Sequence, residues 1–376
     1  MLRLAAINIC VHSRSFAAIL KRVSPAREIA FRVLQRVHGG GYATDLLRRE
    51  SGDPRDLALA ESITLGCLRH QSQLDYLIEF FSGRKQPKLD DEVRIALRMG
   101  IFQLRYLDRI PAHAAVTDSV DLVKQAHKRS AAGFVNAVLR KVNRSPVAWP
   151  DQATELSVPA WMLERWQQQY GEQAAAAIAR AAMEQPEAVI NPDTGRQQDP
   201  GAQSIVPLLE IQQDMTVLDL CAAPGNKTAQ VLALGGRVTA ADRYLKRLIE
   251  VPAEAQRVVL DAATTTLPFN VKFDRILVDA PCSGTGTLAR NPEIKWRLRP
   301  NDLARSADLQ RKILEQALPH LKPGGKLVYS TCSLEREENE DIVKGLSVTA
   351  THLRLPGRDP GDGFFAAVII KGTVHG

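Results

Sequence analysis

Two short apolar runs, each followed by a cysteine, constrain the fold of this chain more than any other feature. The first, Asp274 to Gly286, reads DRILVDAPCSGTG, and the second, Lys326 to Ser333, reads KLVYSTCS. Such runs are typical of strands buried in a parallel sheet. Chemistry in open α/β sheets takes place beyond the carboxyl ends of the strands, so Asp279, Cys282 and Cys332 are expected to face one crevice. Two thiols and a carboxylate in one crevice indicate a reaction centre.

A further α/β signal begins at Met215. The sequence TVLDLCAAPGNKT, residues 216–228, predicts a strand, a tight turn and the start of a helix, and the runs RVTAAD and RVVLDA predict two more strands. Small or rigid side chains in the turn let a ligand approach the backbone, and the free N–H groups of the helix can meet a carboxylate. Asp242 could bind ribose hydroxyls, as the acidic residue of dinucleotide folds does. The candidate cofactor-binding residues are Cys221, Ala222, Ala223, Pro224, Gly225, Asn226, Lys227, Asp242, Asp261 and Asp279.

The turn contains neither a GxGxxG fingerprint nor a P-loop. A dinucleotide or nucleoside triphosphate is therefore not expected, and S-adenosylmethionine is favoured as the cofactor. The cysteines, five in number, include no C-x-x-C pair and no cluster with zinc spacing, so neither a disulfide framework nor a metal is expected. No apolar run approaches the roughly 20 residues of a membrane span. These features predict a protein of the reducing cytoplasm with no membrane partner, and we expect a monomer.

The first 145 residues predict an all-α bundle, because apolar residues recur at helical spacing from Ser24-Pro25 onward. They carry 24 Lys and Arg against 14 Asp and Glu, although the whole chain has a net charge of only +7. This asymmetry indicates a polyanionic partner, and the alternative is a solvated basic helical surface.

The predicted domains are four. Residues 1–23 are a basic extension that contains no acid, and a transit peptide or a misassigned start would explain it equally. Residues 24–145 form the bundle, residues 146–200 a linker with one helix from Pro159 to about Met183, and residues 201–376 the α/β domain.

Several segments resemble known families. AREIAFRVLQRV, ESITLGCLRH, LRMGIFQLRYLDRIPAHAAVTDSVDLVK and GFVNAVLRKV, in this order, resemble the RNA-binding NusB-like domain that precedes bacterial rRNA cytosine methyltransferases of the RsmB/Fmu/Sun type. DLCAAPGNKT, DAPCSGTG and YSTCS look like the RNA 5-methylcytosine methyltransferases themselves. The resemblance implies a NusB-like bundle followed by a Rossmann-like, S-adenosylmethionine-dependent domain with a mostly parallel seven-stranded sheet. It also implies 16S rRNA as substrate, before or early in subunit assembly.

The same resemblance implies a role for each residue at the two strand ends. Cys332 would be the nucleophile that adds to carbon 6 of cytosine, and Cys282 would assist breakdown of the adduct. Asp279 would hydrogen-bond or protonate the ring at nitrogen 3. Covalent addition makes carbon 5 nucleophilic and so divides one difficult step into easier ones. The alternative is that both cysteines are small buried residues without chemistry.

The sequence departs from the family pattern at three places. Asn226 replaces the second glycine of the usual CAAPGGKT loop, and asparagine tolerates left-handed backbone better than most residues. The middle region is a stub of the usual RNA-binding subdomain. The segment between Asp242 and Asp261 is short, so the crossover helix there should be clipped.

Two charged segments in the second half of the chain have no role in the motifs above. Residues 290–300, RNPEIKWRLRP, place four basic residues around Trp296, which suits phosphate and base contact or, equally, a solvated loop with one packed Trp. The acidic run Glu335–Glu340 predicts a solvated helix start.

Three other functions compete with rRNA methylation. A DNA cytosine methyltransferase would carry a PCQ-type motif and a target-recognition domain, and the sequence has neither. A non-catalytic NusB-like RNA-binding or antitermination factor would not bind S-adenosylmethionine. A methyltransferase that acts on another RNA would share all the motifs.

Overall fold

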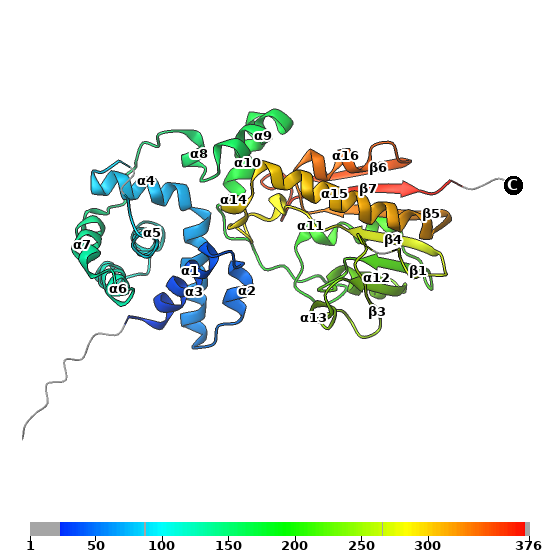
Figure 1. Cartoon of the computed structure of the whole chain (residues 1–376), viewed down its shortest axis with the longest axis horizontal. Coiled ribbons are helices and arrows are strands. Elements are labelled where there is room, and N and C mark those ends of the chain that lie inside the picture. The colour runs from blue at the N-terminus through cyan, green and yellow to red at the C-terminus, as the bar shows by residue number, and fades with distance from the viewer. Residues whose placement is uncertain (1–22, 86–87, 265, 373–376) are drawn as a thin grey trace, which may run out of the picture.

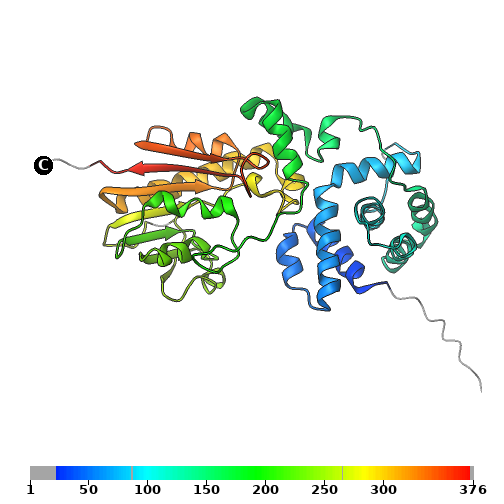
Figure 2. The ribbon, with the colours of Figure 1, turned by 180° about the vertical axis from the view of Figure 1, so that it is seen from behind.

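The computed structural model describes residues 23–85, 88–264 and 266–372. The predictions for the basic extension, including Cys10, lie outside the described residues. A helical bundle forms one end of the molecule and a sheet domain the other, and helices of the middle region lie between them (Figure 1). The view from behind has the same arrangement (Figure 2).

The N-terminal bundle is all-α, as predicted: residues 23–85 and 88–143 contain no strand. Asp53 caps its helix by accepting a hydrogen bond from the backbone N–H of Arg55 at 2.8 Å. Ser24 does not cap; its Oγ accepts from Arg27 Nη1 at 2.9 Å instead. The helices are α1 (Pro25–His38), α2 (Ala43–Arg48), α3 (Pro54–Arg69), α4 (Gln71–Ser82), α5 (Asp91–Tyr106), α6 (Ala112–Gln125) and α7 (Ala132–Lys141).

The core of the bundle forms where the apolar faces of these helices meet. Leu74, Leu97 and Ile101 are completely buried there. Gly66 of α3 allows close approach of α5, because a Cβ at this position would lie 1.9 Å from Cζ of Phe102. The short α2 was not predicted, since a six-residue helix shows too little periodicity.

The middle region holds α8 (Gln152–Glu155), α9 (Ala160–Tyr170) and α10 (Glu172–Ala181). The prediction of one helix from Pro159 to Met183 was wrong, because Gly171 adopts φ 84° and breaks the helix in two. The two halves pack on each other around Trp166, which is fully buried. Beyond them, the only bridge of the stub pairs Ile190 with Gln197 among the described residues of this region.

The C-terminal domain contains a seven-stranded sheet in the order β3-β2-β1-β4-β5-β7-β6. Strands β1 to β5 pair in parallel and β7 is antiparallel to both of its neighbours, so the predicted mostly parallel seven-stranded sheet is confirmed. The strands are β1 (Thr216–Leu220), β2 (Arg237–Asp242), β3 (Gln256–Val259), β4 (Phe273–Asp279), β5 (Leu321–Thr331), β6 (Val348–Arg354) and β7 (Phe364–Ile370).

Helices cover both faces of the sheet (Figure 1). On one face, Ile313 and Leu314 of α15 (Pro300–Ala317) and Ile342 of α16 (Glu340–Val343) bury apolar residues of β4 and β5. On the other face, α12 (Asn226–Ala233) packs through Val231, beside α11 (Pro200–Gln203) and the 3-10 turn Val206–Leu209. The helix after β2, α13, spans only Leu245–Leu248, as the short segment predicted.

Candidate active site

The two cysteines at the strand ends are in contact. Cys332 directly follows β5 and Cys282 lies three residues beyond β4, and the parallel register pairs Asp279 with Ser330. Their sulfurs lie 3.3 Å apart, and both side chains are partly exposed. A disulfide bond measures about 2.05 Å, so these are two free thiols sharing a hydrogen bond. The two thiols thus lie together at one edge of the sheet, as predicted.

Asp279, the last residue of β4, forms an ion pair that the sequence did not predict. Its Oδ2 lies 2.6 Å from Nζ of Lys227, in the first turn of α12, and its Oδ1 accepts from Ser330 Oγ at 2.9 Å. Burial opposes the Lys227 cation, but the charges of Asp279 and Cys332 more than offset it, so the pKa of Lys227 is raised. A cation is therefore held beside both the carboxylate and the Cys332 sulfur.

The thiols near the site differ in environment. The hydrogen bond with Cys332, burial and nearby negative charge raise the pKa of Cys282 well above its usual range. Burial, followed by the charges of Asp279 and Asp242, also raises the pKa of Cys221. Both thiols therefore hold their protons firmly at neutral pH, which leaves Cys332, next to Lys227, as the sulfur with a cation at hand.

A cavity of about 240 Å³ opens at the carboxyl ends of β1, β2 and β4, and we call it the strand-end cavity. Asp242 is nine-tenths buried; its Oδ1 accepts from the Tyr244 N–H at 2.9 Å and its Oδ2 from the Ala223 N–H at 3.3 Å. Leu309 and Ile313 of α15 form an apolar wall opposite. The predicted site residues that line this cavity are Cys221, Ala223, Asp242, Asp261, Asp279, Cys282 and Cys332.

The remaining predicted cofactor residues lie elsewhere. Ala222, Pro224, Asn226 and Lys227 line a neighbouring cleft of about 530 Å³, the interdomain cleft. Gly225 lines neither space. The two spaces share Cys221, Ala223 and Asp279, so they meet at the β1 turn and the end of β4. The opposite wall of the interdomain cleft is built by the helical bundle, through Thr44, Arg48 and Glu61.

The turn after β1 has left-handed backbone at Cys221 (φ 64°) and Gly225 (φ 94°). The expectation that Asn226 must tolerate this conformation was wrong, because Asn226 is the first residue of α12. Its Nδ2 donates to the Gln197 carbonyl at 3.1 Å. The position that requires glycine is Gly225, since a Cβ there would lie 2.7 Å from Cα of Val251. The glycine-to-asparagine departure therefore falls at a position that does not need glycine.

The residues of these two spaces fit S-adenosylmethionine. Asp242 retains acceptor capacity for hydroxyl groups, since two carboxylate oxygens offer about four lone pairs. The apolar wall suits a purine ring. Asp219 of β1 lines the interdomain cleft with its Oδ1 buried and unpartnered within the described chain, and burial raises the pKa of this carboxyl to about 7. The site thus offers an apolar wall to a flat ring and carboxylates to the polar parts of the ligand.

Segment 290–297 is the joint between the two domains: Trp296 is packed, as one alternative expected, but the segment is neither a solvated loop nor a free RNA-binding loop. Lys295 is buried, and its Nζ donates to the carbonyls of Arg69 at 2.9 Å and Ser157 at 2.7 Å. Trp296 Nε1 donates to the Leu68 carbonyl at 2.7 Å. The Ala43 N–H donates to Glu293 at 2.9 Å. These side chains dock onto the helical bundle and are not available for phosphate or base contact.

Arg290 is also occupied within the protein. Its guanidinium lies 2.7 Å from Asp199 and 2.9 Å from Asp362, and both carboxylates are largely buried. Arg297 donates to three carbonyl oxygens at the end of α1, those of Val37, Gly40 and Gly41. Three of the four basic side chains that looked like an RNA-binding loop, those of Arg290, Lys295 and Arg297, thus bind their own chain, and Arg299 is exposed.

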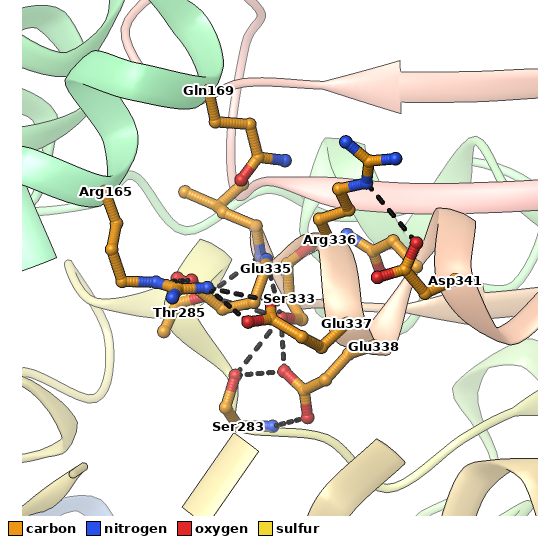
Figure 3. A network of polar contacts seen from close by, with 12 residues as sticks. Arg165, Gln169, Ser283, Thr285, Ser333, Glu335, Arg336, Glu337, Glu338 and Asp341 are labelled. Carbon is orange, nitrogen blue, oxygen red and sulfur yellow. Dashed lines mark hydrogen bonds and ion pairs between the residues drawn. The ribbon is translucent and has the colours of Figure 1, made fainter. Parts of the chain in front are cut away.

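The acidic run Glu335–Glu340 is not a solvated helix start, because Glu335 and Glu338 are fully buried. Arg165 of α9 reaches down to Glu335 and Glu337 in Figure 3, and Glu338 meets Ser283 and Ser333. Burial raises the pKa of Glu335, although Trp166 and Arg165 hydrogen-bond to it. Helical spacing in a short charged run could not distinguish the buried from the exposed carboxylates.

Two kinds of site are not found in the described part of the chain. Residues 23–85, 88–264 and 266–372 contain no group of three or more His, Cys, Asp or Glu side chains that could hold a metal ion. None of the helices in these ranges is both long and apolar enough to cross a membrane.

Known proteins match this chain along most of its length. The NusB family matches residues 24–144 and the family described as 16S rRNA methyltransferase RsmB/F matches residues 206–359. The probable ribosomal RNA small subunit methyltransferase B of Bacillus subtilis (strain 168) is 30% identical over 86% of this chain and 88% of its own. Ribosomal RNA small subunit methyltransferase B of Cronobacter sakazakii (strain ATCC BAA-894) is 31% identical over 94% of this chain and 100% of its own.

A solved structure shares the fold. The crystal structure of PH0851 superposes with a TM-score of 0.74 over 93% of this chain and 99% of that chain, at 20% identity. With relatives at this identity aligned along both domains, the chain belongs to the ribosomal RNA small subunit methyltransferase B family of S-adenosylmethionine-dependent methyltransferases.

Proposed function

We propose that this protein transfers a methyl group from S-adenosylmethionine to carbon 5 of a cytosine in 16S rRNA, through a covalent adduct with Cys332. The observation that carries the proposal is the contact of the Cys282 and Cys332 sulfurs at 3.3 Å, beside the Asp279–Lys227 ion pair. Two thiols in contact and a carboxylate paired with a cation meet the needs of nucleophilic addition to a pyrimidine.

The cofactor is held at the β1 turn and the adjoining strand ends. The residues proposed to hold it are Cys221, Ala222, Ala223, Pro224, Gly225, Asn226, Lys227, Asp242, Asp261 and Asp279. Asp242 faces the strand-end cavity, where it would accept from the ribose hydroxyls. S-Adenosylmethionine supplies an electrophilic methyl group on a sulfonium.

The protein's own groups act on the cytosine ring. The Cys332 sulfur forms a bond to carbon 6, which leaves carbon 5 with the electron density of an enamine. Asp279 hydrogen-bonds the ring at nitrogen 3 and stabilises the charge that develops there. Once carbon 5 carries the methyl group, its proton passes to water as the bond between sulfur and carbon 6 breaks and Cys332 is released as a thiolate. Cys282, in contact with Cys332, assists this breakdown.

The RNA would enter through the interdomain cleft. Arg48 and Thr44 of α2 face the β1 turn across this cleft, so the bundle forms a wall of the same space that Asp279 lines. The excess of basic residues in the first 145 positions suits a polyanion. We infer that the substrate is rRNA before or early in subunit assembly, and that the protein acts as a monomer in the cytoplasm.

Methyl incorporation into unmodified 16S rRNA tests the proposal. With radiolabelled S-adenosylmethionine, the wild type should label the RNA and Cys332→Ala should not. Cys282→Ala should accumulate protein linked to RNA, detected as a slower band on a denaturing gel, because the adduct forms but breaks down slowly. The control Cys67→Ala alters a thiol buried in the bundle and should behave as wild type.

Three other outcomes would change the proposed nucleophile, the proposed function or the proposed substrate. Incorporation that persists in Cys332→Ala would overturn the choice of nucleophile. A wild type that neither binds S-adenosylmethionine nor labels any RNA would favour a non-catalytic RNA-binding factor. Labelling of another RNA in place of 16S rRNA would keep the chemistry and change the substrate.

A further inference from the structure

A buried carboxylate, that of Glu338, lies between the two loops that carry the cysteines. Its Oε1 accepts from the Ser283 N–H at 2.8 Å and from Gln310 Nε2 at 3.1 Å. Its Oε2 accepts from the hydroxyl groups of Ser283 and Ser333. Figure 3 shows both serines converging on this carboxylate. The Glu338 side chain is fully buried and each of its oxygens has two donors.

The two serines link this carboxylate to the cysteine loops. Ser283 directly follows Cys282, and Ser333 directly follows Cys332. The loops lie 50 residues apart in the chain, and their serine hydroxyls are also 3.1 Å from each other. A single carboxylate therefore fastens the residue next to each thiol.

Glu338 is itself held in place by the end of β5. Its carbonyl accepts from the buried Tyr329 hydroxyl at 2.6 Å. The neighbouring Asn339 accepts from Thr331 Oγ1 at 2.5 Å and donates to the Ser333 carbonyl at 2.9 Å. Glu338 is thus anchored to β5 through its own backbone and its neighbour, and a carboxylate held in this way can hold the loop after β4 in place.

The charge of Glu338 also acts on the neighbouring thiol of Cys282. Negative charge on this carboxylate contributes to the raised pKa of Cys282, whereas Cys332 lies beside the Lys227 cation. Position and charge thus act in the same direction: the thiols are held in contact, and Cys282 is kept protonated.

We propose that Glu338 is a positioning residue that clasps the Cys282 and Cys332 loops through Ser283 and Ser333, and so holds the two sulfurs at reacting distance. This positioning matters for catalysis only if the proposed covalent mechanism is correct, so the inference rests on the proposed function. The alternative is that Glu338 merely satisfies buried donors and contributes only to stability.

A vicinal-dithiol probe separates these alternatives without methyl transfer. Phenylarsine oxide condenses with two thiols held close together, forming two arsenic–sulfur bonds and releasing water. The wild type should bind one equivalent that resists competition by a monothiol, and Cys282→Ala should not. Glu338→Ala should weaken this binding at least about 10-fold, because the loops separate; misplacement of about 1 Å can cost about 100-fold in a reaction.

Kinetics supply the second readout. Glu338→Ala should lower kcat about 10- to 100-fold, with KM for 16S rRNA and Kd for S-adenosylmethionine changed less than about 3-fold. Glu338→Gln keeps the size and the Oε1 acceptor and should recover most of both properties. The matched control Glu340→Ala removes an exposed carboxylate of the same run and should match wild type.

The double variant Ser283→Ala/Ser333→Ala covers the possibility that Glu338→Ala does not fold. It removes the hydroxyl donors while Glu338 remains, and it should weaken arsenical bridging and kcat in the same direction. Arsenical binding equal to wild type in folded Glu338→Ala, or in the double variant, would overturn the clasp. If the wild type bridges the arsenical but methylates no RNA, the clasp stands and the proposed function fails.

Discussion

At the scale of single residues, the site depends on which charges stand next to which sulfur. Lys227 pairs with Asp279 at 2.6 Å and interacts with charge on Cys332, while Glu338 stands behind Cys282. The first contact joins the turn after β1 to the end of β4, and the second joins the loops after β4 and β5. The two thiols therefore have different electrostatic surroundings, although their intrinsic chemistry is the same.

Replacing Lys227 tests the cation. Lys227→Met should lower methyl transfer by at least about 10-fold, because Asp279 and Cys332 lose their counter-charge. It should also lower the free energy of unfolding by about 1–3 kcal/mol, since a largely buried carboxylate is left unpaired. Urea denaturation and methyl incorporation measure the two effects. The control is Lys246→Met on the exposed α13, and activity equal to that control would refute the role of the cation.

At the scale of elements, residues 290–297 convert a basic segment into a joint. The segment runs into the short α14 (Ile294–Arg297), where Lys295 and Trp296 donate to carbonyl groups at the end of α3 and Arg297 donates to one at the end of α1. Lys295 is the most constrained of them, because it is fully buried and donates only to carbonyl groups. Burial, and then the charge of Arg69, lower its pKa to about 7.

This pKa predicts a specific dependence of stability on pH. The Lys295 amine in the unfolded chain has a pKa near 10.5, so between pH 7 and 10.5 the unfolded chain binds more protons than the folded one. Stability therefore rises with pH across this window, and it is lowest, for this group, below pH 7. Relative to Lys295→Met, the wild type should gain up to about 4 kcal/mol in free energy of unfolding from pH 7 to 10.

Urea denaturation at a series of pH values measures the difference. Lys246→Met, which changes an exposed lysine, should follow the wild-type curve. Parallel curves for wild type and Lys295→Met would show that the buried amine remains protonated throughout.

At the scale of the whole molecule, the joint makes the helical bundle part of the site. The bundle and the sheet domain could each bury a core alone, but the contacts of Glu293, Lys295 and Trp296 fix one relative to the other. The interdomain cleft exists only in this arrangement, since Arg48 and Lys227 line it from opposite domains. If the bundle holds RNA, as we propose, this arrangement would present it to the strand ends at a set distance.

Loosening the joint should uncouple the domains. Trp296→Ala/Arg297→Ala removes a packed ring and the donors to three carbonyl groups, a loss of about 3 kcal/mol or more for the ring alone. In calorimetry, a single unfolding transition should separate into two. Methylation of 16S rRNA should fall, with the Kd for S-adenosylmethionine unchanged. Arg305→Ala, on the exposed face of α15, is the control, and one undivided transition in the double variant would contradict the prediction.

Most of the helices and the ends of the catalytic strands could be predicted from local sequence patterns. Helical spacing and short apolar runs depend on neighbours in the chain, so the bundle, the mostly parallel sheet and the edge where Cys282 and Cys332 meet could all be predicted. The break at Gly171 escaped because one glycine is compatible with both a continuous and a broken helix.

The contacts of the charged side chains, in contrast, follow from the packing of segments that are distant in the sequence. Glu293 binds Ala43 across 250 residues, and Glu338 joins two loops that are 50 residues apart, whereas Glu340 in the same run is exposed. A carboxylate in a polar run looks the same whether it faces water or a buried hydroxyl group. Which of the two it meets depends on packing between distant segments, because burial is favourable only where donors from elsewhere replace the lost water.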